Sequence, residues 1–173
     1  MHIAHGQELR KGRHSVPGHC YLLTSVTYNR QPVFLDFVSA RLCIQAMQYQ
    51  HNIGRIDSHA YVIMPDHFHW LVTLREKGSL SAIMQSVKGF SSRAIAKRYS
   101  SRQECRSYVG AVSRPRINDP VWQKGYHDHA LRDDEGLRQV ARYIVANPVR
   151  AGLVRRAIEY PHWDAEWYEP HLL

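Results

Sequence analysis

Two histidines separated by one residue, His67 and His69, begin an apolar segment. Residues at i and i+2 of a β-strand project from the same face of a sheet, so both imidazoles can reach one divalent metal ion. Residues 61–64 are apolar, a Pro-Asp turn follows them, and residues 70–74 are apolar again, which predicts a buried hairpin. A pair of partly buried, hydrogen-bonded histidines would fit the same pattern, so the pair alone does not establish a metal site.

Tyr143 is the candidate nucleophile of the chain. Apolar residues at helical spacing between Leu137 and Val145 predict a helix, and projection at 100° per residue puts Tyr143 at the border between core and solvent. A phenol oxygen in that position can attack a phosphate and form a covalent phosphotyrosine. The tyrosine must lose its proton to react, so nearby positive charge should help. A tyrosine that only seals the edge of the core is the alternative.

Asn147 lies one turn after Tyr143 and on the same flank. If this helix packs against the strand face that carries His67 and His69, the Asn147 oxygen could be a third metal ligand. Two imidazole nitrogens and one neutral oxygen leave positions open, which suits Mg²⁺ or Mn²⁺ better than a closed structural zinc site. Asn147 could equally end the helix before Pro148.

A second His-x-His pair, His127 and His129, lies on a predicted fourth strand. These histidines share a face, as the first pair does. They could bind the metal instead, supply a base, or line the site.

The charge of the chain is strongly basic, with 23 Lys and Arg against 15 Asp and Glu. Nine of the basic residues and a single acid, Glu104, fall between Lys77 and Asn118. A block of one sign usually faces a polyanion, although it can also be a solvated helix face. The residues expected to contact DNA are Arg13, Lys88, Arg93, Lys97, Arg98, Arg114 and Arg116.

The order of elements is β-α-β-β-α-β followed by one more helix. Strands are expected at about 20–28, 56–64, 67–74 and 121–131, and helices at about 37–50 and 80–99. Asp36, and Asp133 or Asp134, are the expected N-caps of two helices, and Pro148 the end of the last. This order is that of an α+β, ferredoxin-like sheet, with the last helix carrying the tyrosine.

The 173 residues suit one domain. Residues 1–17 are expected to be a mobile basic arm, 18–155 the catalytic domain, and 156–173 a tail that packs on the body. No apolar run is long enough to span a membrane, no secretory signal is visible, and three scattered cysteines indicate reduced thiols. We therefore expect a cytoplasmic protein with no membrane partner.

Four segments together resemble a known family. They are 18–34, the Met-Pro-Asp-His-Phe-His strand end at 64–69, the block 122–132, and the strongest match, Tyr-Ile-Val-Ala-Asn-Pro-Val-Arg-Ala-Gly-Leu-Val at 143–154. Over about residues 13–161 the chain resembles the HUH single-tyrosine transposases, and most closely the REP-associated tyrosine transposases. The segment after Tyr160-Pro161 departs from the family's pattern.

This resemblance implies that His67 and His69 are metal ligands, that Tyr143 is the nucleophile, and that Asn147 stands at a third ligand position. It implies cleavage and rejoining of single-stranded DNA beside hairpins, with Mg²⁺ or Mn²⁺, through a 5′-phosphotyrosine. The alternatives are a rolling-circle or relaxase-type endonuclease and a non-catalytic nucleic-acid-binding regulator. Whether the protein is a monomer or a homodimer stays open.

Overall fold

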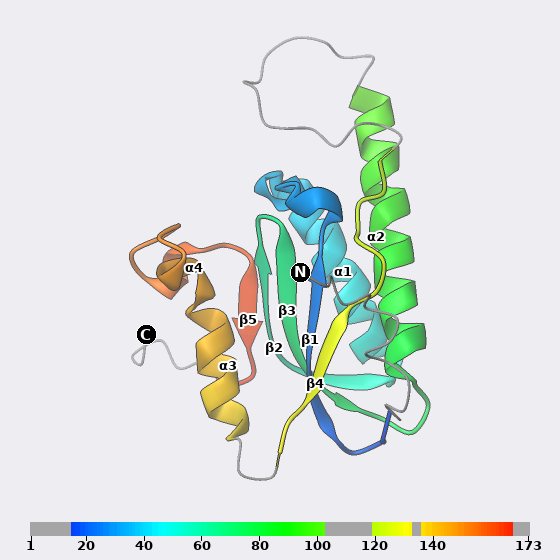
Figure 1. Cartoon of the computed structure of the whole chain (residues 1–173), viewed down its shortest axis with the longest axis vertical. Helices are drawn as coiled ribbons and strands as arrows, with labels where there is room; N and C mark the ends of the chain where they lie inside the picture. The colour runs from blue at the N-terminus through cyan, green and yellow to red at the C-terminus, as the bar shows by residue number, and fades with distance from the viewer. Residues whose placement is uncertain (1–14, 103–118, 133–135, 168–173) are drawn as a thin grey trace, which may run out of the picture.

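A single antiparallel sheet of five strands, in the order β4-β1-β3-β2-β5, organises the molecule (Figure 1). The structure is a computed structural model and describes residues 15–102, 119–132 and 136–167. The strands are β1 (Cys20–Val26), β2 (Ile56–Met64), β3 (His67–Leu74), β4 (His127–Ala130) and β5 (Trp163–Ala165). The first four strands have the order and directions of a ferredoxin-like sheet, so the predicted fold class is confirmed.

Helices cover both faces of this sheet. They are α1 (Phe37–Asn52), α2 (Leu80–Arg102), α3 (Leu137–Val145) and α4 (Asn147–Arg150), with 3-10 turns at Tyr28–Arg30, Val33–Leu35 and Ala157–Glu159. In Figure 1, α2 stands on the β4 side of the sheet and α3 on the β5 side. Among the described residues, no helix has the length and apolar character needed to cross a bilayer.

Alternation along β3 divides the core in two. Phe68, Trp70, Val72 and Leu74 are fully buried and pack with α1 and α2 in the larger cluster. Leu71 faces the other way and packs with α3 in the smaller cluster. β3 is therefore a central strand covered on both sides, as the sequence predicted, but its second face is apolar only at Leu71, since His67, His69 and Thr73 are half-buried polar residues.

Asp36 begins α1, as predicted. Its carboxylate accepts hydrogen bonds from the backbone nitrogen of Ser39 (3.1 Å) and from the Ser39 hydroxyl (2.8 Å). The Arg98 guanidinium of α2 also donates two bonds to it, at 3.0 and 3.1 Å. One carboxylate therefore caps α1 and ties α2 to it.

The fourth strand is shorter than the predicted 121–131. Trp122 forms an isolated bridge with Thr27, and regular pairing starts only at His127. Gly125 has a φ of +83°, and the Lys88 ammonium binds the carbonyl oxygens of Gln123 and Gly125. These contacts hold residues 123–125 toward α2 and interrupt the pairing with β1, although the backbone nitrogen of Gln123 still donates to the Val26 carbonyl at 3.0 Å.

The last predicted helix is divided in two. Its N-cap is Gly136 rather than an aspartate, because helical geometry begins only at Leu137; Asp133 and Asp134 lie outside the described residues. Pro148 ends α3 as expected, but it also stands in the first turn of α4. A first turn tolerates proline because its N–H groups have no partner within the helix.

Residues beyond 156 add to the sheet. β5 pairs with β2 through Ala60, Tyr61 and Val62. The Tyr160 hydroxyl donates to the Ile63 carbonyl at 2.7 Å. The predicted boundaries of the arm, domain and tail stay a prediction.

Candidate active site

The helix that carries Tyr143 lies against the strand face that carries His67 and His69, as the sequence predicted. On that face, Leu71 of β3 and Val62 and Met64 of β2 pack with Ala141 and Ile144 of α3. Val62 is paired with His69, and Met64 with His67. The apolar stripe of α3 therefore covers the β2 side of the face and ends beside the two histidines.

His67 is oriented by the residue before it. Its Nδ1–H donates to Asp66 Oδ1 at 2.6 Å, and Arg30 Nη1 donates to Asp66 Oδ2 at 3.0 Å. Burial by itself raises the pKa of Asp66, but the bonds from His67 and Arg30 outweigh it and hold that pKa below its usual value. Because this contact keeps the proton on Nδ1 of the neutral ring, the lone pair of Nε2 is available for a metal ion.

His69 is held in the same manner by β1. Its Nδ1 and the Thr24 hydroxyl are hydrogen-bonded at 2.8 Å. Burial, and then the charges of His67 and Arg150, lower the pKa of His69 to about 4. His69 is therefore neutral at pH 7, the form in which an imidazole binds a metal.

Arg30 reaches Asp66 from an unusual backbone. Both Asn29 and Arg30 have a φ of 51°, in the left-handed region that residues other than glycine rarely adopt. Such strain tends to persist where the surrounding structure requires it, often at functional sites. Sequence reasoning missed Arg30; the asparagine before it, a residue type that tolerates this region, was the available signal.

Tyr143 is 53% exposed. The Arg150 guanidinium of α4 lies over its ring, with Cζ 4.1 Å from the ring centroid. The same arginine acts on the pKa of His69, so its charge lies close to both groups. Sequence reasoning also missed Arg150, although its spacing of seven residues from Tyr143, two helical turns, was a signal.

Asn147 stands at the junction of α3 and α4. Its amide nitrogen donates to the carbonyl oxygens of Tyr143 (3.3 Å) and Ile144 (3.1 Å). Asn147 therefore caps the C-terminal end of α3, which is the second role that the sequence allowed for it. These bonds use the nitrogen and not the oxygen, so a role of the oxygen as a metal ligand stays a prediction.

The spacing of the two histidine rings is compatible with a shared metal ion. The two ring centroids lie 4.9 Å apart, and rings bound to one ion through Nε2 at ~2.1 Å should lie roughly 4.5–5 Å apart. Among the described residues, no cluster of three or more His, Cys, Asp or Glu side chains could hold a metal. A metal at His67 and His69 would therefore need other ligands, such as the Asn147 amide, water or substrate oxygen.

The second histidine pair, His127 and His129, lies on the same face of the sheet as His67 and His69, but on the edge strand β4. His127 pairs with Thr24, and Thr24 pairs with His69, so the three residues form one row across β4, β1 and β3. Both His127 and His129 are exposed. With strands ~4.8 Å apart, His127 lies about 10 Å from His69 along the sheet, too far to share its ion directly.

The basic residues predicted to contact DNA differ in their surroundings. Lys88 binds the carbonyls of residues 123 and 125, and Arg98 is paired with Asp36, so internal contacts occupy both. Arg93 and Lys97 are exposed on α2. Arg13, Arg114 and Arg116 lie outside the described residues.

The chain is similar to known transposases. Residues 15–147 match the family described as Transposase IS200 like. A Haemophilus influenzae protein whose name places it among the REP-associated tyrosine transposases is 28% identical over 147 residues, which cover 84% of this chain and 78% of that protein. The REP-associated tyrosine transposase of Escherichia coli K12 is 25% identical over 155 residues, with 86% and 78% covered.

The fold is that of a solved relative as well. The structure of a REP-associated tyrosine transposase bound to a REP hairpin matches with a TM-score of 0.63 at 21% identity, over 87% of this chain and 79% of that one. The family match spans both the histidine pair and Tyr143. This chain therefore belongs to the IS200-like transposase family, and its named relatives are REP-associated tyrosine transposases.

Proposed function

We infer that the protein cleaves and rejoins single-stranded DNA beside a hairpin, with Tyr143 as the nucleophile. One observation carries the proposal: the charge of Arg150 lies over the Tyr143 ring and also acts on His69. A tyrosine that only sealed the core would need neither neighbour. Convergence of a half-exposed phenol, a guanidinium and a pair of imidazoles suits attack on a phosphodiester.

Cleavage begins when the Tyr143 oxygen attacks the scissile phosphorus and the P–O3′ bond breaks. The phenol loses its proton, and the departing 3′ oxygen gains one. The products are a 5′-phosphotyrosine and a free 3′-OH. Because the phosphoester link conserves the energy of the broken bond, a second 3′-OH can reverse the step and join a new strand.

Arg150 has two tasks in this step. Its contact with the aromatic face orients the ring of Tyr143. The planar guanidinium can also donate two parallel hydrogen bonds to phosphate oxygens. Charge accumulates on these oxygens as the bond to tyrosine forms, and a guanidinium already in place stabilises it.

His67 and His69 would hold a divalent ion, with Asn147 as the proposed third ligand. A bound Mg²⁺ or Mn²⁺ would polarise the scissile phosphate and neutralise part of its charge. Asp66 and Thr24 keep both imidazoles in place by bonding their Nδ1 atoms. His67 would present Nε2 to the ion, and His69 would do the same with its Nδ1–H donating to the Thr24 hydroxyl, which is the arrangement that metal-binding histidines use.

A hairpin substrate is supported by two independent considerations. The solved relative is bound to a REP hairpin. The chain itself is basic, with a net charge of +8, and exposes Arg93 and Lys97 on α2. A single-stranded segment can reach a face that is open over β4 and β1, where His127 and His129 are exposed.

The proposal is tested with labelled oligonucleotides. Wild-type protein and Tyr143→Phe are incubated with a panel of hairpins with single-stranded flanks, in Mn²⁺ and in EDTA. We expect a covalent protein–DNA band only for the wild type with Mn²⁺. Binding without any band across the panel would favour a regulator, and a band on origin-like nicking substrates alone would favour a replication initiator or relaxase.

A further inference from the structure

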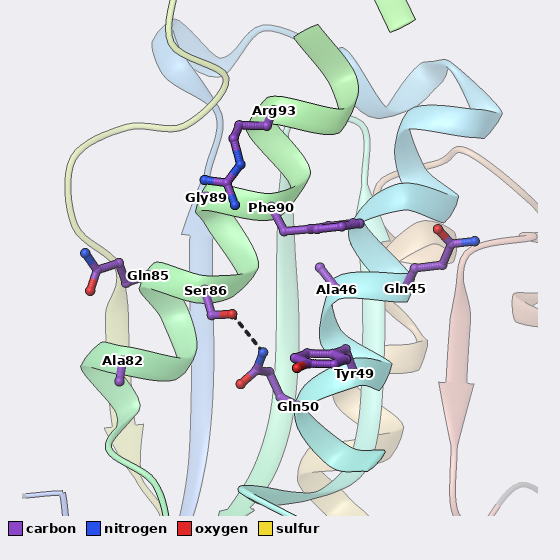
Figure 2. A pocket seen from close by; sticks show the side chains of 10 residues that line it. All are labelled: Gln45, Ala46, Tyr49, Gln50, Ala82, Gln85, Ser86, Gly89, Phe90 and Arg93. Atoms are coloured by element: carbon purple, nitrogen blue, oxygen red, sulfur yellow. Dashed lines mark hydrogen bonds between the residues drawn. The ribbon is translucent and has the colours of Figure 1, made fainter. Parts of the chain in front are cut away.

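A groove lies between α1 and α2 (Figure 2). These helices pack on one face of the sheet, whereas α3, which carries Tyr143, packs on the other. We name it the α1–α2 groove; it has a volume of about 660 Å³, which is within the range of ligand sites. Its lining includes Ala46, Tyr49, Gln50, Ser86, Gly89, Phe90 and Arg93. Nothing in the proposed cleavage chemistry uses this groove.

Two aromatic rings border the groove from opposite helices. Tyr49 of α1 is 57% exposed and Phe90 of α2 is 44% exposed. Figure 2 shows both rings edge-on, one above the other, with Ala46 between them. Flat apolar faces that stay exposed in the free protein suit a planar aromatic ligand, which can stack on them.

The floor of the groove is formed by the polar, uncharged side chains of Gln50 and Ser86. Gln50 is buried and donates from Nε2 to the Ser86 hydroxyl at 2.9 Å, while Arg55 donates to its Oε1 at 3.3 Å. Arg93 stands at the border of the groove and is the one charged residue among the described residues that line it. A ligand with an aromatic ring and an adjacent anion matches these groups.

The charge of both helices agrees with a polyanion. Neither Phe37–Asn52 nor Leu80–Arg102 contains an Asp or Glu. A docked protein partner would have to accept a basic surface with exposed aromatics, whereas a nucleotide supplies both a base to stack and a phosphate for Arg93. Stacking on aromatics beside a positive groove is how proteins bind single-stranded nucleic acid.

The groove adjoins a second hollow that extends toward the residues preceding β4. Gln85 and Gly89 line both the groove and a second hollow, which is bordered further on by Trp122, Gly125 and Tyr126. Tyr126 is followed directly by His127, which lies in the same row as Thr24 and His69. A strand leaving the groove can thus pass around the β4 edge and reach the histidine pair.

We propose that the α1–α2 groove binds an unpaired base of the DNA, stacked on Tyr49 and Phe90 with its phosphate near Arg93. The site would hold the uncut part of the same strand that Tyr143 attacks on the other face. This inference rests on the proposed function for its substrate. The base contact itself needs neither cleavage nor a metal.

The test compares a single-stranded DNA of 12 thymidine nucleotides with a strand of the same length and the same phosphates in which every base is absent. Affinities are measured by fluorescence anisotropy in EDTA. We expect wild-type protein to prefer the thymidine strand by about tenfold, as one base–aromatic contact allows. Tyr49→Ala and Phe90→Ala should lose most of this preference while binding the abasic strand unchanged.

Two further variants separate stacking from structural damage. Phe37→Ala removes an aromatic of α1 that is 56% exposed and lies outside the groove, and it should keep the full preference. Gly89→Leu fills the groove and leaves both rings in place. A Cβ at Gly89 would meet the flexible end of Arg93 at 3.3 Å, and leucine favours a helix over glycine, so the fold should persist. This variant too should lose the preference.

Equal weakening of the thymidine and abasic strands by Tyr49→Ala and Phe90→Ala would overturn the inference, as would a preference that survives Gly89→Leu. Failure of the proposed function has a different signature. In that case no covalent band forms, yet the wild type still distinguishes the two strands and Tyr143→Phe does so equally well.

Discussion

Arg150 lies over the ring of Tyr143, with its Cζ 4.1 Å from the ring centroid, although the two residues belong to different helices. The bend at Ala146–Pro148 separates α3 from α4 and turns Arg150 back onto the face of the tyrosine. This contact joins the candidate nucleophile to a cation whose charge also lowers the pKa of His69.

Replacing Arg150 should therefore impair the chemical step. We expect Arg150→Ala to lower the single-turnover cleavage rate by about 100-fold, as loss of a transition-state donor does elsewhere. Arg150→Lys should restore part of the rate, because it keeps the charge and loses the planar fork. The control is Arg155→Ala, an exposed arginine nearby. A weaker DNA affinity with an unchanged rate at saturation would assign Arg150 to binding alone.

The first histidine pair should hold the metal. We expect His67→Ala and His69→Ala to lose Mn²⁺ binding and cleavage together, as measured by calorimetry and by the covalent band. His127→Ala and His129→Ala should keep Mn²⁺ binding, because their strand lies two positions away from β3. The opposite pattern would transfer the metal site to the β4 pair.

Asp66 should act on metal affinity through His67. Asp66→Asn keeps the shape of the side chain but removes the charge that fixes the Nδ1 proton of His67. We expect Mn²⁺ to bind ~10–100-fold more weakly, the usual effect of changing a residue that orients a metal ligand. Asp57→Asn, which breaks a surface pair with Arg75, is the matched control and should leave the affinity unaltered.

Asp36 should make stability depend on pH. Burial alone raises the pKa of Asp36, but the hydrogen bonds from Arg98 and Ser39 outweigh it, so the folded pKa is lowered. A lowered folded pKa means that the stabilisation is present above the unfolded value near 4 and is lost as the pH falls through the folded value.

Asp36→Asn tests this dependence, because asparagine can still cap α1 and cannot pair with Arg98 as an ion. We expect it to lower the free energy of unfolding by about 1–2 kcal/mol at pH 7, the value of a hydrogen bond to a charged group. Urea titrations at pH 7 and pH 3 should show the difference shrinking in acid. A difference of the same size at both values would contradict the ionic account.

Local patterns predicted the centre of the fold. The bounds of β2 and β3 agree with the sequence because an apolar run on each side of a Pro-Asp turn leaves little freedom of register. The cap at Asp36 and the face of α3 that meets the sheet also followed from local spacing. Local spacing therefore predicted that the helix carrying Tyr143 packs on the strand face that carries His67 and His69.

Features that depend on distant contacts were not predictable in the same way. β5 has only three residues and exists because β2 offers an edge to pair with. The late start of β4 depends on Lys88, which lies far away in sequence. Arg30 reaches the site through a left-handed turn, which produces no periodic pattern. Arg150 has helical spacing from Tyr143, but a break between α3 and α4 separates the two residues, so spacing within one helix does not establish their contact.

The polarity and position of the covalent link test the central claim most directly. A substrate strand is labelled at either its 5′ or its 3′ end, the covalent complex is isolated, and the modified peptide is mapped by mass spectrometry. We predict that the 3′ label stays with the protein, that the 5′-labelled fragment is released with an extendable 3′-OH, and that the nucleotide is attached to Tyr143. Attachment at any other residue, or retention of the 5′ label, would contradict the account.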